Sequence, residues 1–194
     1  MTKLTRENLD SLEKYSENRN VFRNKVMAHK KNRRVALGEH AALYFEDEMT
    51  MRYQVQEMLR IEKIFEAEGI QDELDVYNPL IPDGHNWKAT FMIEYTDESE
   101  RKIALANMLG IDMTVWVKVD GCDKVHPVSN EDLQRESAEK TASVHFMRFE
   151  LTDDMLAKAK SGANISMGID HPYYTVKIDA IDEQVRQSLV GDLH

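Results

Sequence analysis

Cysteine is almost absent from this chain, since Cys122 is the only one in 194 residues. A single cysteine excludes an intrachain disulfide, a CxxC redox pair and an iron–sulfur site ligated entirely by cysteine. A bound metal ion would therefore need His, Asp or Glu ligands. Cys122 also lies between Gly121 and Asp123 in a predicted hairpin turn, which is a poor setting for an activated thiolate.

Long apolar runs are also lacking. No segment approaches the roughly 20 apolar residues that span a bilayer. The polar start MTKLTRENLD has no apolar signal-peptide region. We therefore expect no membrane insertion and a cytoplasmic location. The hydrophobic content of 42% and the charged content of 31% are typical of a soluble globular chain.

Positive charge is scarce, with 25 Lys and Arg against 35 Asp and Glu. Nucleic-acid binding depends on neutralising many phosphates, so this balance argues against a nucleic-acid partner. One basic run stands out and contains His29, Lys30, Lys31, Arg33 and Arg34. One interpretation is structural, because cations complement the negative end of the dipole where a predicted helix ends. The alternative is that these residues form a surface patch that binds an anion or an acidic partner.

Familiar catalytic motifs are missing as well. The chain has no GxSxG elbow, no P-loop and no GxGxxG phosphate loop. Their absence removes the best-known reactions from consideration but leaves the question of enzymatic activity open.

The first half of the chain predicts helices around a small hairpin. Apolar spacing indicates short helices over residues 5–15 and 21–29, and alternation indicates a hairpin over 35–45. Residues 47–68 contain neither Gly nor Pro and precede Gly69, so they predict the longest helix of the chain.

The second half contains an internal repeat. An alternating strand over residues 87–95, a helix capped at Thr96 and Asp97 and a strand over 113–119 form the first copy. A strand over 146–151, a cap at Thr152 and Asp153, a helix and a strand over 165–169 repeat this order. The pattern predicts an α+β fold with an antiparallel sheet, for which a ferredoxin-like βαββαβ arrangement and an unrelated α+β meander are both candidates.

The turn-rich stretch 78–84 separates these halves. We expect a helical region with a hairpin over residues 1–84, a sheet region over 85–178 and a C-terminal helix within 179–194. The length favours one compact domain that contains all three.

Glu62 interrupts the expected apolar face of the predicted long helix. It lies among Met51, Val55, Met58, Ile61 and Phe65, with Gln54 and Glu66 in the same arc. A buried carboxylate requires a cation, a hydrogen-bond partner or a metal ion. A structural buried pair or a helix edge that reaches solvent is the commoner explanation, and a ligand or catalytic acid is the alternative.

Two histidines provide a second group of candidates. The strand phase points His145 and His171 inward, whereas Arg148 and Glu150 share the opposite face and could form a charge pair. If both histidines converge with Glu62, they resemble a two-histidine, one-carboxylate site for iron or another transition metal. No HxH or HExxH spacing supports that site, and hydrogen-bonded core histidines are the commoner outcome.

Four stretches of the chain carry a resemblance to a known family: AHKKNRRVALGEHAALYFEDEMTMRYQVQEMLRIEKIFEAEGI, YNPLIPDGHNWKATFMIEY, TASVHFMRFEL and GIDHPYY. They resemble a bacterial family known as domain-of-unknown-function family 3501. The resemblance covers nearly the whole chain and brings no established activity, so it assigns no catalytic residue. It implies a redox or oxidative-stress setting, because genes of the family lie near those for rubrerythrin-like proteins and iron–sulfur oxidoreductases.

Two functional hypotheses follow from these observations. The first is a non-catalytic accessory or assembly protein for an iron–sulfur oxidoreductase or a rubrerythrin-like partner. The alternative is a small transition-metal-binding protein or metal-dependent enzyme that uses Glu62, His145 and His171. In the alternative, Arg148 would orient an anionic substrate or pair with Glu62, with Gln54 and Glu150 as polar support.

Overall fold

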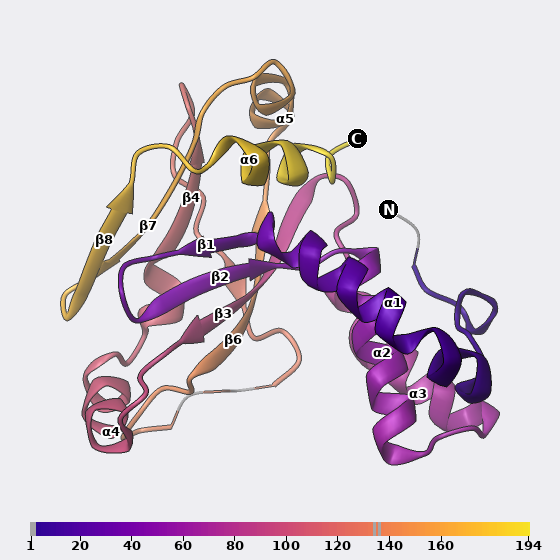
Figure 1. Ribbon diagram of the computed structural model, residues 1–194. Helices are drawn as coiled ribbons and strands as arrows, with labels where there is room; N and C mark the ends of the chain where they lie inside the picture. Colours follow the sequence, from indigo (N-terminus) through magenta and orange to yellow (C-terminus); the bar gives the residue numbers. More distant parts are fainter. Residues whose placement is uncertain (1–2, 134, 136) are drawn as a thin grey trace.

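The chain folds into an α+β protein in which a helical lobe lies beside a body with two antiparallel sheets (Figure 1). This computed structural model describes residues 3–133, 135 and 137–194. The described helices are α1 (Leu12–Lys31), α2 (Glu48–Glu62), α3 (Ala67–Tyr77), α4 (Glu98–Asn107), α5 (Asp153–Lys160) and α6 (Glu183–Val190), with short 3-10 turns η1 (Arg6–Asn8), η2 (Asn78–Leu80) and η3 (Ile111–Thr114).

The first sheet has the strand order β1-β2-β3-β6-β5, and the second has the order β4-β7-β8. The strands of the first sheet are β1 (Arg34–Ala36), β2 (Ala41–Phe45), β3 (Asn86–Ile93), β6 (Val144–Glu150) and β5 (Val128–Ser129). Those of the second are β4 (Val115–Val119), β7 (Ile165–His171) and β8 (Tyr174–Ile178). One hydrophobic core contains inward side chains from both sheets.

The internal repeat is present, and it crosses between the sheets. The two first strands pair antiparallel, with Trp87 of β3 opposite Phe149 of β6. The two second strands also pair antiparallel, with Val117 of β4 opposite Met167 of β7. Each repeat therefore supplies one strand to each sheet, which differs from the single four-stranded sheet of a ferredoxin-like arrangement. In β4, alternate residues Val115, Val117 and Val119 belong to the core, whereas the other face carries the buried Trp116 and the half-buried Lys118.

The N-terminal helices differ from the sequence expectation. The predicted helices over 5–15 and 21–29 are one helix, α1, which begins after the Ser11 cap. The stretch between Leu12 and Lys31 contains no Gly or Pro. The helix therefore continues through residues 16–20, although the apolar spacing is lost there. With 20 residues, α1 is the longest of the described helices.

The predicted helix over 47–68 is divided in two. Asp47 caps its start by accepting from the Thr50 amide, but α2 ends at Glu62 and is followed by Lys63, which has a left-handed φ of 57°. Gly69 is not a cap, since it lies inside α3. A Cβ at Gly69 would lie 2.8 Å from Ile64 Cγ2, so the glycine permits this side chain to pack closely.

A polar cluster joins α1 to α2 in the helical lobe. Glu57 of α2 accepts hydrogen bonds from the Tyr15 hydroxyl at 2.7 Å and from two nitrogens of Arg19 at 2.7 and 2.8 Å. The hydrogen bonds from Arg19 lower the pKa of Glu57 to about 2. In the same lobe, apolar residues that include Val55 and Leu74 form a second small core.

A membrane-spanning helix must be both long and apolar. Within the described ranges, none combines the length and the apolar character needed to cross a membrane.

Gly168 on β7 permits a close approach between Trp116 and β8. A Cβ at this position would lie 2.5 Å from both Trp116 Cζ2 and the Val176 carbonyl oxygen. We therefore expect Gly168→Ala to lower the free energy of unfolding by about 1–3 kcal/mol, measured by urea denaturation. Gly191→Ala is the matched control because Gly191 has an ordinary φ of −60° and its nearest neighbour is at 3.3 Å. Equal stability of the two variants would contradict this packing role.

Candidate functional site

His145 on β6 is fully buried and hydrogen-bonded at both ring nitrogens. Its Nε2 lies 3.0 Å from the Ala142 carbonyl oxygen, and its Nδ1 lies 3.0 Å from the Asn130 side-chain nitrogen. A carbonyl oxygen only accepts, so the hydrogen-bond network assigns the ring proton to Nε2, while Nδ1 accepts from the Asn130 amide. The Nδ1 lone pair, which would have to bind a metal ion, therefore accepts a hydrogen bond instead.

The surroundings of His145 also resemble a nucleophile–base arrangement. The Thr141 hydroxyl lies 3.0 Å from His145 Nε2, and Asp112 lies 3.9 Å from Nδ1. In the assigned tautomer Nε2 already carries a proton and cannot remove one from Thr141. We therefore interpret this group as a buried structural network.

His171 lies in the other sheet, on β7. Its Nε2 donates to the Leu109 carbonyl oxygen at 2.9 Å, and its Nδ1 accepts from the Tyr173 amide at 3.2 Å. These bonds close the β7–β8 hairpin and attach it to the end of the α4 connection. Both histidines are thus hydrogen-bonded core residues.

Glu62 is exposed at the end of α2, near the half-buried Gln54 and the exposed Glu66. Met51 and Val55 of the predicted arc are buried together with Leu59, whereas Met58 is half-buried and Ile61 and Phe65 are exposed. Within the described ranges, no three His, Cys, Asp or Glu side chains are grouped closely enough to hold a metal ion. Glu62, His145 and His171 therefore do not form a common site.

The predicted charge pair between Arg148 and Glu150 is present. Arg148 also binds both carboxylate oxygens of Glu131 at 2.8 Å. These hydrogen bonds raise the pKa of the Arg148 guanidinium. Its ion pairs attach the segment after β5 to the sheet, so Arg148 does not support Glu62.

The basic run at the end of α1 does not form a continuous patch. Arg33 is only 2% exposed and His29 pairs with Asp47 at 2.5 Å, so both point inward. Arg34 pairs with Glu94 at 3.2 Å. Lys30 and Lys31 remain at the surface. The predicted anion or partner patch is therefore corrected, because Arg33 is buried and the half-buried His29 and the exposed Arg34 are engaged in ion pairs.

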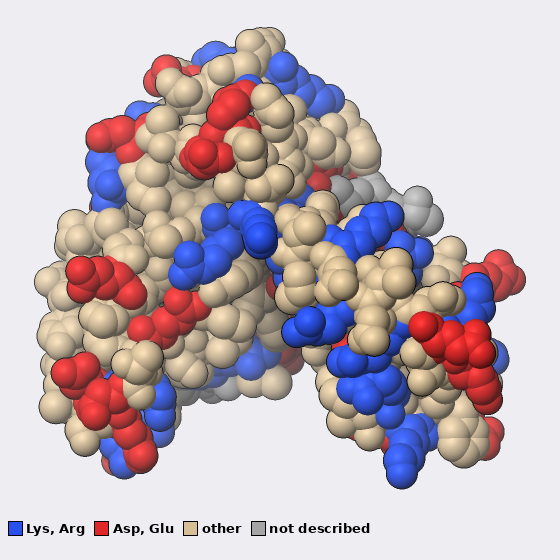
Figure 2. Space-filling view, viewed as in Figure 1, with Lys and Arg blue, Asp and Glu red and all other residues tan. Residues whose placement is uncertain are grey.

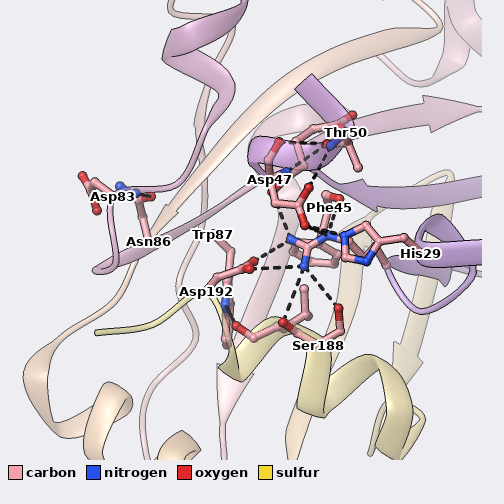
Figure 3. A network of polar contacts seen from close by, with 12 residues as sticks. His29, Phe45, Asp47, Thr50, Asp83, Asn86, Trp87, Ser188 and Asp192 are labelled. Atoms are coloured by element: carbon pink, nitrogen blue, oxygen red, sulfur yellow. Dashed lines mark hydrogen bonds and ion pairs between the residues drawn. The ribbon is translucent and has the colours of Figure 1, made fainter. Parts of the chain in front are cut away.

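Arg33 is the centre of a buried polar junction, part of which is labelled in Figure 3. Its Nε donates to the Phe45 carbonyl oxygen at 3.0 Å, and its Nη2 donates to the Glu46 carbonyl oxygen at 3.0 Å and to Asp192 at 2.5 Å. Its Nη1 donates to the Ser188 hydroxyl at 3.2 Å. The junction connects β1, the end of β2 and the C-terminal end of α6.

Two carboxylates share this guanidinium, and their pKa values move in opposite directions. Burial opposes ionisation of Asp47, but Arg33, the Thr50 amide and His29 together hold its pKa below the usual range. Burial raises the pKa of Asp192 to about 6, and the nearby Asp47 carboxylate contributes to this rise, against the opposing effect of Arg33.

A groove lies at the outer end of the helical lobe, and we call it the lobe-end groove. It has a volume of about 820 Å³. The N-terminal segment forms one wall, and the end of α2 with the start of α3 forms the other. Its lining residues are Thr5, Arg6, Glu7, Leu9, Asp10, Ser11, Leu12, Glu13, Leu59, Ile64, Phe65, Ile70 and Gln71.

The lobe-end groove combines apolar walls with an acidic rim. Phe65 is 70% exposed, and Ile61, on the neighbouring turn of α2, is 61% exposed. Glu7, Asp10 and Glu13 line the groove beside a single cation, Arg6. Figure 2 shows acidic side chains at this right-hand end of the lobe.

Sequence reasoning placed Ile61 and Phe65 in a buried arc and missed this groove. The break at Lys63 accounts for Phe65, which lies beyond the end of α2. Ile61 lies within α2, but the buried residues of that helix are centred on Val55 and Leu59 and do not include it. The sequence carries no Gly or Pro signal for that break.

The raised pKa of Asp192 predicts a specific pH dependence. The pKa is about 6 in the folded protein and 3.8 in ordinary surroundings, so the folded state takes up this proton first as pH falls. The group's contribution to stability is therefore largest at low pH and is lost as pH rises through about 6, by at most about 3 kcal/mol.

Asp192→Asn removes this titration. The unfolding free energy of the wild type minus that of the variant should increase as pH falls from about 7.5 to about 4.5, measured by urea denaturation. Acidic groups that do not interact with Asp192 titrate alike in both proteins and cancel in the difference. A difference that does not change with pH would contradict the assignment.

Comparison with known proteins places the whole chain in one family. Residues 3–193 match the family described as "Protein of unknown function (DUF3501)". A crystal structure of a novel protein of unknown function from Burkholderia pseudomallei is 52% identical, covers 100% of both chains and has a TM-score of 0.95. The search of curated proteins found no match. The chain therefore belongs to the DUF3501 family of proteins of unknown function.

Proposed function

We propose that this protein is a non-catalytic accessory or assembly protein that binds a partner protein through the lobe-end groove. The exposure of Phe65 and Ile61 beside a groove with apolar walls carries this proposal. Neighbouring exposed apolar side chains of this kind mark interaction sites, because burying them against a partner removes them from water.

The charge of the rim indicates the chemistry of the partner. Three carboxylates and one cation line the groove, and the exposed Glu62, Glu66 and Glu68 follow on the same end of the lobe. A basic amphipathic helix would place apolar side chains between the walls and its Lys or Arg side chains against the rim. We therefore propose such a helix as the occupant.

The environments of the reactive side chains support a non-catalytic role. His145 and His171 use their ring nitrogens in core hydrogen bonds. The Cys122 thiol donates to Asp154 at 3.4 Å, and burial raises its pKa, which disfavours the reactive thiolate.

The identity of the partner rests on the family resemblance. We propose an iron–sulfur oxidoreductase or a rubrerythrin-like protein from the same organism, with a basic amphipathic segment exposed on its surface.

The docking chemistry can be tested with a fluorescent peptide of sequence LKKLLKLLKKLLKL. We expect it to bind about tenfold more tightly than its acidic counterpart LEELLELLEELLEL, a difference of about 1.4 kcal/mol. Phe65→Ser should weaken binding of the basic peptide by about tenfold, because an aromatic contact is lost. Fluorescence anisotropy measures both effects.

Ile103→Ser is the matched control, since Ile103 lies on α4 outside the groove and is 60% exposed. It should leave peptide binding unchanged. Equal affinity for the two peptides, or equal losses in the Phe65→Ser and Ile103→Ser proteins, would exclude the groove as the docking site.

The proposed partners require a separate experiment with purified proteins. We expect the iron–sulfur oxidoreductase or the rubrerythrin-like protein to bind the wild type and the Ile103→Ser protein, and to bind the Phe65→Ser protein more weakly, in biolayer interferometry. Binding of neither protein would reject this partner class while leaving the peptide result intact.

A further inference from the structure

A second cavity lies against the outer face of the first sheet, and we call it the sheet-face cavity. It has a volume of about 630 Å³, within the range of small-molecule sites. The end of α3 with η2 forms one wall, the segment after β5 forms the other, and β3 and β6 form the floor. Its lining residues are Asp75, Val76, Tyr77, Pro79, Leu80, Lys88, Glu131, Asp132, Leu133, Arg135, Phe146, Met147 and Arg148.

The floor of the cavity carries two cations that face each other. Lys88 on β3 is directly opposite Arg148 on β6 in the strand register. Like charges in opposite positions of an antiparallel pair repel each other. Anions must therefore lie near both positions if the sheet is not to be destabilised here.

Arg148 is directly ion-paired, whereas the carboxylates of Asp83, Glu131 and Glu150 act on Lys88 without a direct ion pair. Glu131 and Glu150 both form ion pairs with Arg148. The half-buried Lys88 donates from Nζ to the Pro79 carbonyl oxygen, and no carboxylate of the described residues forms an ion pair with it. Burial lowers the pKa of the Lys88 ammonium, and the opposite effect of Asp83 does not restore it. A partly desolvated cation with free donor positions thus forms part of the cavity floor.

The walls are apolar and open to an additional molecule. Val76 is 63% exposed and Leu133 is 55% exposed, although both line the cavity. Phe146 adds an aromatic surface, with the Arg135 guanidinium 4.5 Å from its ring centre. The same guanidinium forms an ion pair with Asp132, another residue of the cavity lining.

We infer that the sheet-face cavity binds a small amphipathic monocarboxylate, with the carboxylate at Lys88 and the apolar body between Val76, Leu80 and Leu133. A single negative charge fits better than a phosphate, because Glu131, Glu150 and Asp132 surround the position and would repel a second charge. An apolar body explains why the walls lack polar partners for a larger head group.

This inference is independent of the proposed function. The lobe-end groove and the sheet-face cavity share no lining residue. A failure at one site therefore leaves the other unaffected.

Octanoate and octan-1-ol are matched probes, because they have the same chain length and differ in charge. We expect octanoate to bind the wild type about tenfold more tightly in isothermal titration calorimetry, since the ion pair with Lys88 favours the carboxylate. Lys88→Met should abolish this preference. Lys177→Met, at an exposed position of β8, should preserve it.

Leu133→Glu provides a second test in case Lys88→Met fails to fold. Leu133 is an exposed loop residue, so its substitution should leave folding intact. The added carboxylate should weaken octanoate binding more than octan-1-ol binding. Equal affinities of the wild type for both probes, an intact octanoate preference in folded Lys88→Met, or no effect of Leu133→Glu on the relative affinities would overturn the inference.

Discussion

The buried Arg33 guanidinium is the interaction on which the arrangement of this protein depends. It lies where α1 ends and β1 begins, and it binds backbone carbonyl oxygens after β2 and side chains at the end of α6. Asp47 connects the same centre to the start of α2 and to His29. Removing one partner of such a buried pair leaves an uncompensated charge, which costs about 3–5 kcal/mol. The helical lobe, the first sheet and the C-terminal helix are thus held by one set of charges.

The path of the chain on either side of this junction leads to the lobe-end groove and to the sheet-face cavity. The hairpin β1–β2 belongs to the first sheet, although helices precede and follow it in sequence. The lobe is therefore attached at one end, and its other end carries the exposed Phe65 and the acidic rim. The return of the chain through α3 and η2 places a wall over the outer sheet face beside Lys88. Both surfaces follow from the same path of the chain.

Local features were readable from the sequence wherever neighbouring residues determine them. Alternation identified β3 and β6, and the caps at Asp97 and Thr152 marked the starts of α4 and α5. The inward phase of His145 was predictable for the same reason, but its partners Asn130 and Ala142 were not. The break at Lys63 also escaped prediction, because a left-handed lysine has no signal of its own.

The amino-acid sequence by itself determined the α+β class, the internal repeat and the pairing of Arg148 with Glu150, since each depends on short-range periodicity or on neighbouring positions of one strand. Tertiary structure alone decided that equivalent strands of the repeat pair in two separate sheets, that Arg33 is buried and that Lys88 lines a cavity with no direct ion pair to a carboxylate of the described residues. These outcomes depend on contacts between residues far apart in the chain. The energies of such contacts are set by the packing of the whole core, which no local pattern encodes.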